Sequence, residues 1–361
     1  MAKTDKTNQE LTQLRAALLT WYGANRRDLP WRRSRDPYAI WVSEIMLQQT
    51  RVAVVVDRFG EFMARFPTVA ALAAAAEQDV LAVWSGLGYY RRARMLHKAA
   101  QFVTEHCAGA LPGTAAALRL LPGIGGYTSA AIASIAYGEP VAVVDGNVER
   151  VLCRLAGWDA GKNSTELRGR IEGLAAELVD KERAGDFNQA MMELGAVVCM
   201  PRNPQCLVCP LVGACKTRGE HKTAPRARMV TREAAYALCL RETNTGEVLL
   251  EQRPASMTVM PGLWELPVLR DVKRAAAEAH MTVRHAIMQV NYRVHVCRVG
   301  EDEIARATQT GGERRWVALK DTSTIALTGL ARKVLRRMHE VQRGGRDSTV
   351  APGTIEADTG L

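Results

Sequence analysis

The sequence has no apolar stretch long enough to cross a membrane and no hydrophobic segment near its start. A membrane-spanning helix needs about 20 consecutive, mainly apolar residues, but residues 1–10 are mostly polar and no later run approaches that length. Membrane insertion and export are therefore not indicated, and we expect a cytoplasmic protein. Its 361 residues, 47% of them hydrophobic, suffice for two or three domains with real cores.

Cysteine is scarce, and half of the eight cysteines stand alone without a pairing pattern. Together with the missing signal segment, this argues against a disulfide framework. The isolated cysteines are Cys107, Cys153, Cys239 and Cys297.

The other four cysteines fall within a short segment rich in basic residues and proline. Four thiolates in one short loop can hold a zinc ion or a [4Fe–4S] cluster. Zinc sites usually combine two closely spaced cysteine pairs, and only Cys206 and Cys209 form such a pair here. The wide first gap favours the bulkier cluster. The predicted ligands are Cys199, Cys206, Cys209 and Cys215.

Acidic residues are outnumbered by basic ones, 38 to 48, which gives a formal net charge of +10. An excess of this kind favours a polyanionic partner, although many soluble proteins are basic. The grouping of the charges strengthens the argument. Arginines cluster in residues 26–35, and three arginines and a lysine lie in residues 91–98, on one predicted helix.

Two patterns divide the chain. Up to about Lys216, apolar residues recur at helical spacing, and after a polar, basic segment the pattern changes to short strand-like runs. We therefore expect a mainly α N-terminal part and an α+β C-terminal domain. The predicted helices span 11–22, 39–59, 69–84, 91–105, 115–120, 128–137, 148–155, 164–178 and 187–198, followed by 272–279 and 328–341. The predicted strands span 235–240, 247–252, 263–269, 291–298 and 315–319.

A glycine-rich segment, Leu-Pro-Gly-Ile-Gly-Gly at 121–126, separates two predicted helices. Such a turn can direct backbone amides at a phosphate from a helix N-terminus, or it can be an ordinary interhelical turn. In a basic chain with a thiolate cluster, a helix-hairpin-helix that binds the DNA backbone through Gly123, Gly125 and Gly126 is the better interpretation.

Two carboxylates lie in unlike surroundings. Glu44 sits in an apolar segment, where burial raises the pKa of a carboxyl and makes it a proton donor, unless it simply pairs with a nearby arginine or tyrosine. Asp145 follows an apolar run. We expect it to be the N-cap of the next helix and also a carboxylate at the mouth of an apolar pocket, supported by a hydrogen bond from Asn147. Glycosidic cleavage requires such a pair, and a nucleobase as the leaving group gives an N-glycosylase.

Together these motifs resemble those of the helix-hairpin-helix DNA glycosylases with an iron–sulfur cluster, and among them the adenine DNA glycosylase (MutY) family. The cysteine spacing is that of the family. The matching segments are LPWR at 29–32, SEIMLQQTRV at 43–52, WSGLGYY at 84–90, the hairpin at 121–126, VDGNV at 144–148 and FNQAMMELG at 187–195.

The resemblance implies a six-helix barrel with a helix-hairpin-helix, a domain bearing one [4Fe–4S] cluster, and a Nudix-like C-terminal domain that checks for 8-oxoguanine. The expected partner is double-stranded DNA with adenine opposite 8-oxoguanine or guanine, bound by a monomer associated with the bacterial nucleoid. The expected ranges are 1–36 with 146–216 for the cluster domain, 37–145 for the barrel, 217–232 for a linker, 233–342 for the Nudix-like domain and 343–361 for a disordered tail.

The resemblance also assigns catalytic roles. Glu44 corresponds to the general acid that protonates adenine at N7, and Asp145 to the carboxylate that stabilises, or transiently bonds to, the sugar cation. Tyr127 would hydrogen-bond within this pair, and Asn147 would order the acid or the water. Related endonuclease III enzymes carry a lysine where this chain has Tyr127. A phenol cannot form an imine, so we expect a monofunctional glycosylase.

Two further groups follow from the resemblance. Arg32 and Gln189 match residues that read the flipped adenine. The residues matching those around the opposite 8-oxoguanine are Gln49, Thr50, Leu87 and Tyr89, with Tyr89 wedged into the base stack.

The C-terminal domain departs from the family at one loop. Many members carry Phe-Ser-His there, but this chain continues from Ala286 with Ile-Met-Gln, unless Asn291 and Tyr292 take over through a shifted loop. Strictness for 8-oxoguanine over guanine is therefore left open. No Nudix hydrolase motif follows Gly262, so magnesium-dependent nucleotide hydrolysis is not expected.

Two alternatives remain. A thymine–guanine mismatch glycosylase of the same superfamily shares the tyrosine after the hairpin but generally lacks the C-terminal domain. A non-catalytic iron–sulfur DNA-binding protein would not need both Glu44 and Asp145.

Overall fold

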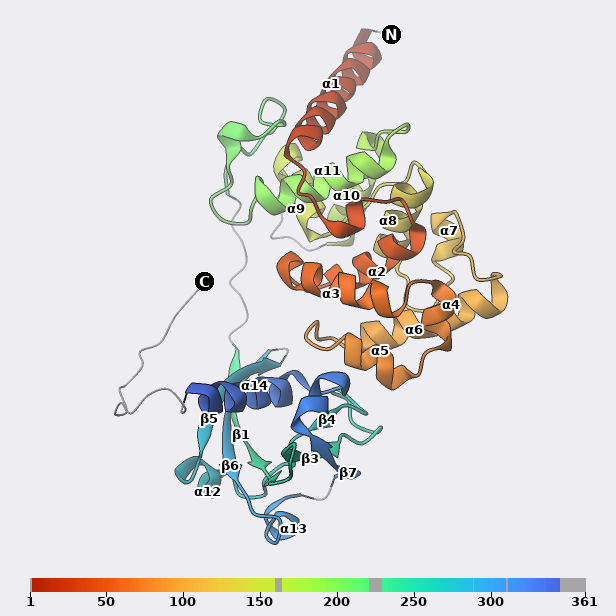
Figure 1. The fold of residues 1–361 in the computed structure, drawn as a ribbon. Coiled ribbons are helices and arrows are strands. Elements are labelled where there is room, and N and C mark those ends of the chain that lie inside the picture. The colour runs from red at the N-terminus through yellow and green to blue at the C-terminus, as the bar shows by residue number, and fades with distance from the viewer. Residues whose placement is uncertain (1, 160–163, 221–228, 288, 310, 345–361) are drawn as a thin grey trace. The chain divides into compact units, whose positions relative to one another are not determined.

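The computed structural model describes residues 2–159, 164–220, 229–287, 289–309 and 311–344. The chain forms two compact units, Met1–Ala227 and Arg228–Leu361. Unit 1 is helical and unit 2 contains the strands (Figure 1). No helix in these ranges is long and apolar enough to span a membrane. The expected change from a mainly α to an α+β pattern is therefore confirmed.

The helices of unit 1 agree with the apolar periodicity except at two breaks. The predicted helix 39–59 is two helices with a turn between them, and 69–84 is broken at Ala75 and Ala76, which are extended. The second break lies in an alanine-rich run, which does not mark it, whereas the first falls on four polar residues, 48–51, that the predicted helix had passed over. The elements are α1 Ala2–Asn25, η1 Pro30–Arg32, α2 Pro37–Leu47, α3 Val52–Arg65, α4 Val69–Ala74, α5 Glu77–Val83, α6 Arg91–His106, α7 Ala115–Leu118, α8 Gly126–Tyr137, α9 Gly146–Ala156, α10 Thr165–Leu178, α11 Ala184–Val197 and η2 Cys206–Val208.

Two groups of helices build unit 1 (Figure 1). Helices α1, α9, α10 and α11 share one core around Leu18, Leu152 and Leu194, so the start of the chain packs against its later helices. The second group of helices includes α3 and α5. In it, the ring of Phe62 on α3 packs edge-on against Trp84 at the end of α5, with 5.9 Å between the ring centroids. Each fully buried side chain of this size contributes about 1.5–3 kcal/mol.

Unit 2 contains two sheets. In the first, β6 lies between β1 and β5, parallel to β1 and antiparallel to β5, and in the second β3 pairs with β2, β4 and β7. The first-sheet strands are β1 Val230–Leu238, β5 Met281–Ile287 and β6 Val290–Arg298. The remaining elements are β2 Leu240–Arg241, β3 Glu247–Gln252, β4 Trp264–Glu265, α12 Val272–Ala277, α13 Ile304–Ala307, β7 Arg314–Ala318, η3 Leu319–Thr324 and α14 Gly329–Gly344.

Three expectations for unit 2 need correction. Strand β1 begins at Val230, inside the predicted linker, because its exposed first residues pair through their backbone with β6. Strand β5 was missed, since only Val283 of it is buried. The predicted strand 263–269 shrinks to β4, the two residues Trp264 and Glu265. Helix α14 extends to Gly344, and the rest of the predicted tail lies outside the described residues.

The hairpin of β5 and β6 also answers one open question. Asn291 and Tyr292 lie within β6, paired with Ala286 and His285. They are strand residues, and the proposed shifted loop is wrong.

Candidate active site

A cavity of about 750 Å³ opens in unit 1 between α2, α8, α9 and α11. Small-molecule sites have volumes of about 300–1,000 Å³. Most of the expected site residues line it, whereas Leu87 and Tyr89 do not. The expected residues that it brings together are Arg32, Glu44, Gln49, Thr50, Gly123, Gly125, Gly126, Tyr127, Asp145, Asn147 and Gln189.

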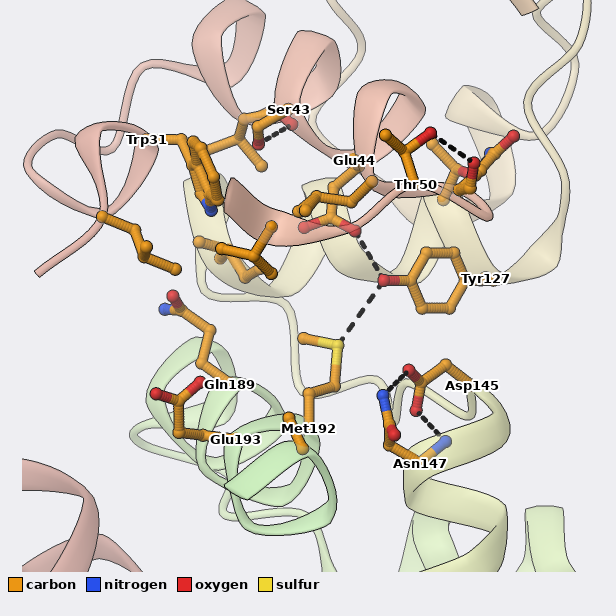
Figure 2. A pocket seen from close by; sticks show the side chains of 18 of the residues that line it. Trp31, Ser43, Glu44, Thr50, Tyr127, Asp145, Asn147, Gln189, Met192 and Glu193 are labelled. Carbon is orange, nitrogen blue, oxygen red and sulfur yellow. Dashed lines mark hydrogen bonds between the residues drawn. The ribbon is translucent and has the colours of Figure 1, made fainter. Parts of the chain in front are cut away.

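Glu44 reaches this cavity from a helix that is almost entirely buried. The side chain of Asp36 accepts from the first free amides of α2, and Pro37 opens the helix, so its start is well defined. Glu44 is 5% exposed, and its Oε2 accepts a 2.6 Å hydrogen bond from the Tyr127 hydroxyl (Figure 2). Burial raises the pKa of Glu44 to about 7, against the lowering effect of that hydrogen bond. The carboxyl can therefore hold a transferable proton near neutral pH.

The Tyr127 hydroxyl lies between Glu44 and the thioether of Met192, whose Sδ is 3.5 Å away (Figure 2). Burial, and then the neighbouring Glu44 carboxylate, raise the pKa of Tyr127. The phenol therefore stays protonated and serves as a hydrogen-bond donor to Glu44.

Asp145 is held at the N-terminus of α9. Its Oδ1 accepts from the backbone amides of Asn147 (2.9 Å) and Val148 (2.8 Å), and its Oδ2 accepts from Asn147 Nδ2 at 2.9 Å. The expected N-cap role is confirmed, and it also fixes the carboxylate in one orientation. Helix α11 approaches closely at Gly195, where an added Cβ would lie 2.6 Å from the Cβ of Asn147.

A buried carboxylate that the sequence reasoning missed holds Arg32. Glu193, 1% exposed, accepts from Arg32 Nη2 at 2.9 Å and from two guanidinium nitrogens of Arg27 at 2.7 Å. Although burial favours the neutral acid, these hydrogen bonds lower the pKa of Glu193 to about 2. The argument that singled out Glu44, an acid in an apolar helix, would have identified Glu193 too. Gln189, one turn earlier, lines the cavity beside it (Figure 2).

The hairpin between α7 and α8 requires glycine at one position. Gly123 has a left-handed φ of 74°, and a Cβ there would lie 2.7 Å from the Cβ of Met95. Gly125 is the N-cap of α8 and Gly126 is its first residue, so the hairpin ends at a helix N-terminus. Such a terminus favours an anion.

Leu87 and Tyr89 lie in the turn between α5 and α6, outside the cavity lining. Leu87 is buried, whereas Tyr89 is half exposed and has a left-handed φ of 47°. The turn contacts the cavity's edge through Thr50, whose Oγ1 lies 3.3 Å from the carbonyl of Leu87.

The four clustered cysteines line one small cavity of their own. Burial, and to a lesser degree the other three thiols, raise the pKa of Cys209, and Arg154 Nη1 donates to Cys199 Sγ at 3.3 Å. No three potential ligands among the described residues are arranged to hold a single metal ion. Four cysteine thiols that line one cavity are a donor set of the kind that an iron–sulfur cluster uses.

One guanidinium contacts both sites. Arg150 on α9 donates through Nη2 to Asn147 Oδ1 at 2.8 Å and through Nε to the carbonyl of Cys199 at 2.8 Å. The Asn147–Asp145 pair and the first cysteine therefore share a direct hydrogen-bonded connection.

Comparisons with known proteins agree with this geometry. Residues 42–177 match the HhH-GPD superfamily of base excision DNA repair proteins. The chain is 35% identical to the adenine DNA glycosylase of Homo sapiens, with 93% of this chain and 76% of the human protein covered. It is also 35% identical to the Arabidopsis thaliana adenine DNA glycosylase, with 80% and 52% covered.

Among solved structures, a thermostable thymine-DNA glycosylase aligns with a TM-score of 0.55 at 30% identity, covering 59% of this chain and 98% of that one. A trapped endonuclease III–DNA intermediate shares the fold, with a TM-score of 0.50 at 23% identity over 58% of this chain and 96% of that one. The alignment with the human enzyme covers most of both chains at 35% identity, and Glu44 and Asp145 lie in one cavity. This chain therefore belongs to the adenine DNA glycosylase (MutY) family.

Proposed function

We propose that this chain is a monofunctional base-excision repair glycosylase that hydrolyses the N-glycosidic bond of adenine mispaired with 8-oxoguanine or guanine. The observation that carries the proposal is Glu44, a buried acid with a pKa of about 7, in the same cavity as the fixed carboxylate of Asp145. Membership in the adenine DNA glycosylase family supplies the leaving base.

The reaction needs both acids. Glu44 donates its proton to N7 of the flipped adenine, and the bond between the sugar C1′ and adenine N9 breaks with its electron pair on the base. Asp145 stabilises the resulting oxocarbenium-like cation. Water adds at C1′ and loses a proton, which restores the acid and leaves an abasic sugar. Arg32, held by Glu193, and Gln189 line the space for the base.

Tyr127 supports the absence of strand cleavage. Cleavage through a Schiff base needs an amine, and this position holds a phenol that donates to Glu44.

The remaining proposals concern the cofactor, the domains and the partner. Cys199, Cys206, Cys209 and Cys215 would hold one [4Fe–4S] cluster, which supports the fold of its loop. We assign residues 1–36 and 146–216 to the cluster domain, 37–145 to the barrel and 233–342 to a Nudix-like reader of 8-oxoguanine. We propose that the protein binds damaged duplex DNA as a monomer. The relatives include human and plant proteins, so association with a bacterial nucleoid stays a prediction.

The first experiment measures base release under single-turnover conditions from two duplexes, adenine opposite 8-oxoguanine and thymine opposite guanine, with and without alkali. We expect adenine release, and strand breaks only after alkali. Thymine release would instead support the alternative, which the likeness to a thymine-DNA glycosylase keeps relevant. Breaks without alkali would contradict a monofunctional enzyme.

The rate of adenine release should depend on pH in one direction. Because Glu44 must be protonated to act and its pKa is about 7, the single-turnover rate should be constant below that pH and fall about tenfold per pH unit above it. The measurement is a pH–rate profile at saturating enzyme. A rate that rises through neutral pH would assign the proton donation to another group.

A further inference from the structure

Arg92, in the first turn of α6, makes an unusual number of contacts with backbone carbonyls. Its side chain joins the end of α2 and the α2–α3 turn to the α5–α6 turn, and no role has been given to it above. Nη1 donates to the carbonyls of Ile45 (2.8 Å), Met46 (2.9 Å) and Gln48, and Nη2 donates to Thr50 Oγ1 (3.0 Å) and to the carbonyls of Leu87 (3.0 Å) and Gly88 (3.2 Å).

The Nη1 contacts cap a helix from outside. The carbonyls of Ile45 and Met46 belong to the last turn of α2, where they have no intrahelical partner, and Gln48 is the C-cap residue. A positive charge at a helix C-terminus is favourable. Arg92 therefore satisfies the end of the helix that carries Glu44.

The Nη2 contacts reach the turn that carries Tyr89, and the guanidinium also lies against two aromatic rings. Its central carbon is 5.5 Å from the ring centroid of Trp84 and 5.5 Å from that of Tyr89. No carboxylate in the described part of the chain accepts from Arg92. Burial lowers the pKa of Arg92 to about 10, so the side chain is still charged at neutral pH. Backbone carbonyl dipoles and aromatic ring faces therefore stabilise the positive charge of Arg92.

Both turns contain backbone that a non-glycine residue adopts at a cost. Gln49 has a φ of 56° and Tyr89 a φ of 47°, both left-handed. Such conformations persist only where the surroundings hold them. Arg92 donates to residues of both turns, and the Thr50 hydroxyl, to which Arg92 also donates, adds a longer contact to the carbonyl of Leu87 at 3.3 Å.

We propose that Arg92 is a positioning residue for recognition of the base opposite adenine: it locks the turn carrying Gln49 and Thr50 to the turn carrying Tyr89, so that the two act as one preformed reading surface. This inference rests on the proposed function and on the family resemblance, which implies that Gln49, Thr50 and Tyr89 lie around the base opposite adenine. A preformed surface does not have to be ordered when DNA binds, and specificity for the mispair increases accordingly.

Lysine should not replace Arg92. It keeps the charge but has three donors on one nitrogen and no planar fork, and so cannot reach both turns at once. The test variant is R92K. The matched control is R94K on the same helix, because Arg94 pairs with the carboxylate of Glu77 at 2.9 Å.

The experiment measures binding to a duplex with a non-cleavable adenine analogue opposite 8-oxoguanine, the same analogue opposite guanine, and a fully paired duplex. For R92K we expect the Kd for the 8-oxoguanine duplex to rise about tenfold or more, which corresponds to about 1.4 kcal/mol. The Kd for the paired duplex, set mainly by phosphate contacts, should change by less than about twofold. Discrimination between 8-oxoguanine and guanine should shrink, and R94K should match the unmodified protein.

Two further readouts separate positioning from folding and from the proposed function. The pH–rate profile of R92K should keep its bend near the pKa of Glu44, since the proton donor is unchanged. Hydrogen exchange of the amides in 48–51 and 86–90 should accelerate together in R92K and not in R94K, whatever the enzyme's activity. An R92K protein with unchanged Kd values, or with only one turn loosened, would overturn the inference. If the unmodified protein releases no adenine, the proposed function is wrong. The hydrogen-exchange rates of the two turns would still show whether Arg92 joins them.

Discussion

Replacing Glu44 by glutamine is expected to lower the single-turnover rate of adenine release by about 100-fold or more, because general acid catalysis contributes a factor of about that size. Glutamine has nearly the same shape and can still accept the hydrogen bond from Tyr127. It has no acidic proton, so it cannot protonate the leaving base. The Kd for the mispaired duplex should stay within about threefold of that of the unmodified protein, since a tenfold change would already indicate about 1.4 kcal/mol of lost contacts.

The matched control for this variant is E61Q. Glu61 is an exposed residue of α3 that pairs with Arg58, and the same chemical change there should leave both rate and Kd unaltered. The residual rate of E44Q should also lose its fall above neutral pH, since the titrating group is gone. An E44Q enzyme with the full rate, or one whose fall with pH persists, would show that the proton comes from elsewhere.

Replacing Cys209 by serine is expected to remove the iron–sulfur cluster and, with it, specific DNA binding. Cys209 lines the same small cavity as the other three clustered cysteines. Losing the cluster would release the loop after Cys199, which Arg150 connects to the Asn147–Asp145 pair. The measured iron content should fall from about four atoms per chain to far fewer. The affinity for the mispaired duplex should weaken as well.

Cys107 offers the control, because it lies at the end of α6, outside the cysteine-lined cavity. The C107S variant should keep its iron and its affinity. If the unmodified protein contains one zinc atom per chain and no iron, the four cysteines bind zinc and the cluster assignment is wrong. A C209S protein that keeps its iron would remove Cys209 from the ligand set.

Most of the site chemistry that the sequence alone could determine came from short sequence motifs. The cysteine spacing, the glycine hairpin and two carboxylates in unlike apolar surroundings are short-range features, and residue type fixes what each can do. Most helices of unit 1 were likewise predictable, because burial of one helical face imposes a period that adjacent residues reveal. The break at Ala75–Ala76 was not, since the alanine-rich run continues through it, and the break at Gln48–Arg51 was missed although these four residues are polar.

Only the tertiary structure decided how these groups act on one another. That Glu193 holds Arg27 and Arg32, and that Arg92 joins two turns, depends on residues more than 40 positions apart or on backbone carbonyls, which every residue has. Strand β5 was hidden for a related reason: its partner is the backbone of β6, and only one of its side chains is fully buried. The sequence states the chemistry of each side chain directly. Long-range pairing through the backbone can involve any residue type, so it is seen only in the folded structure.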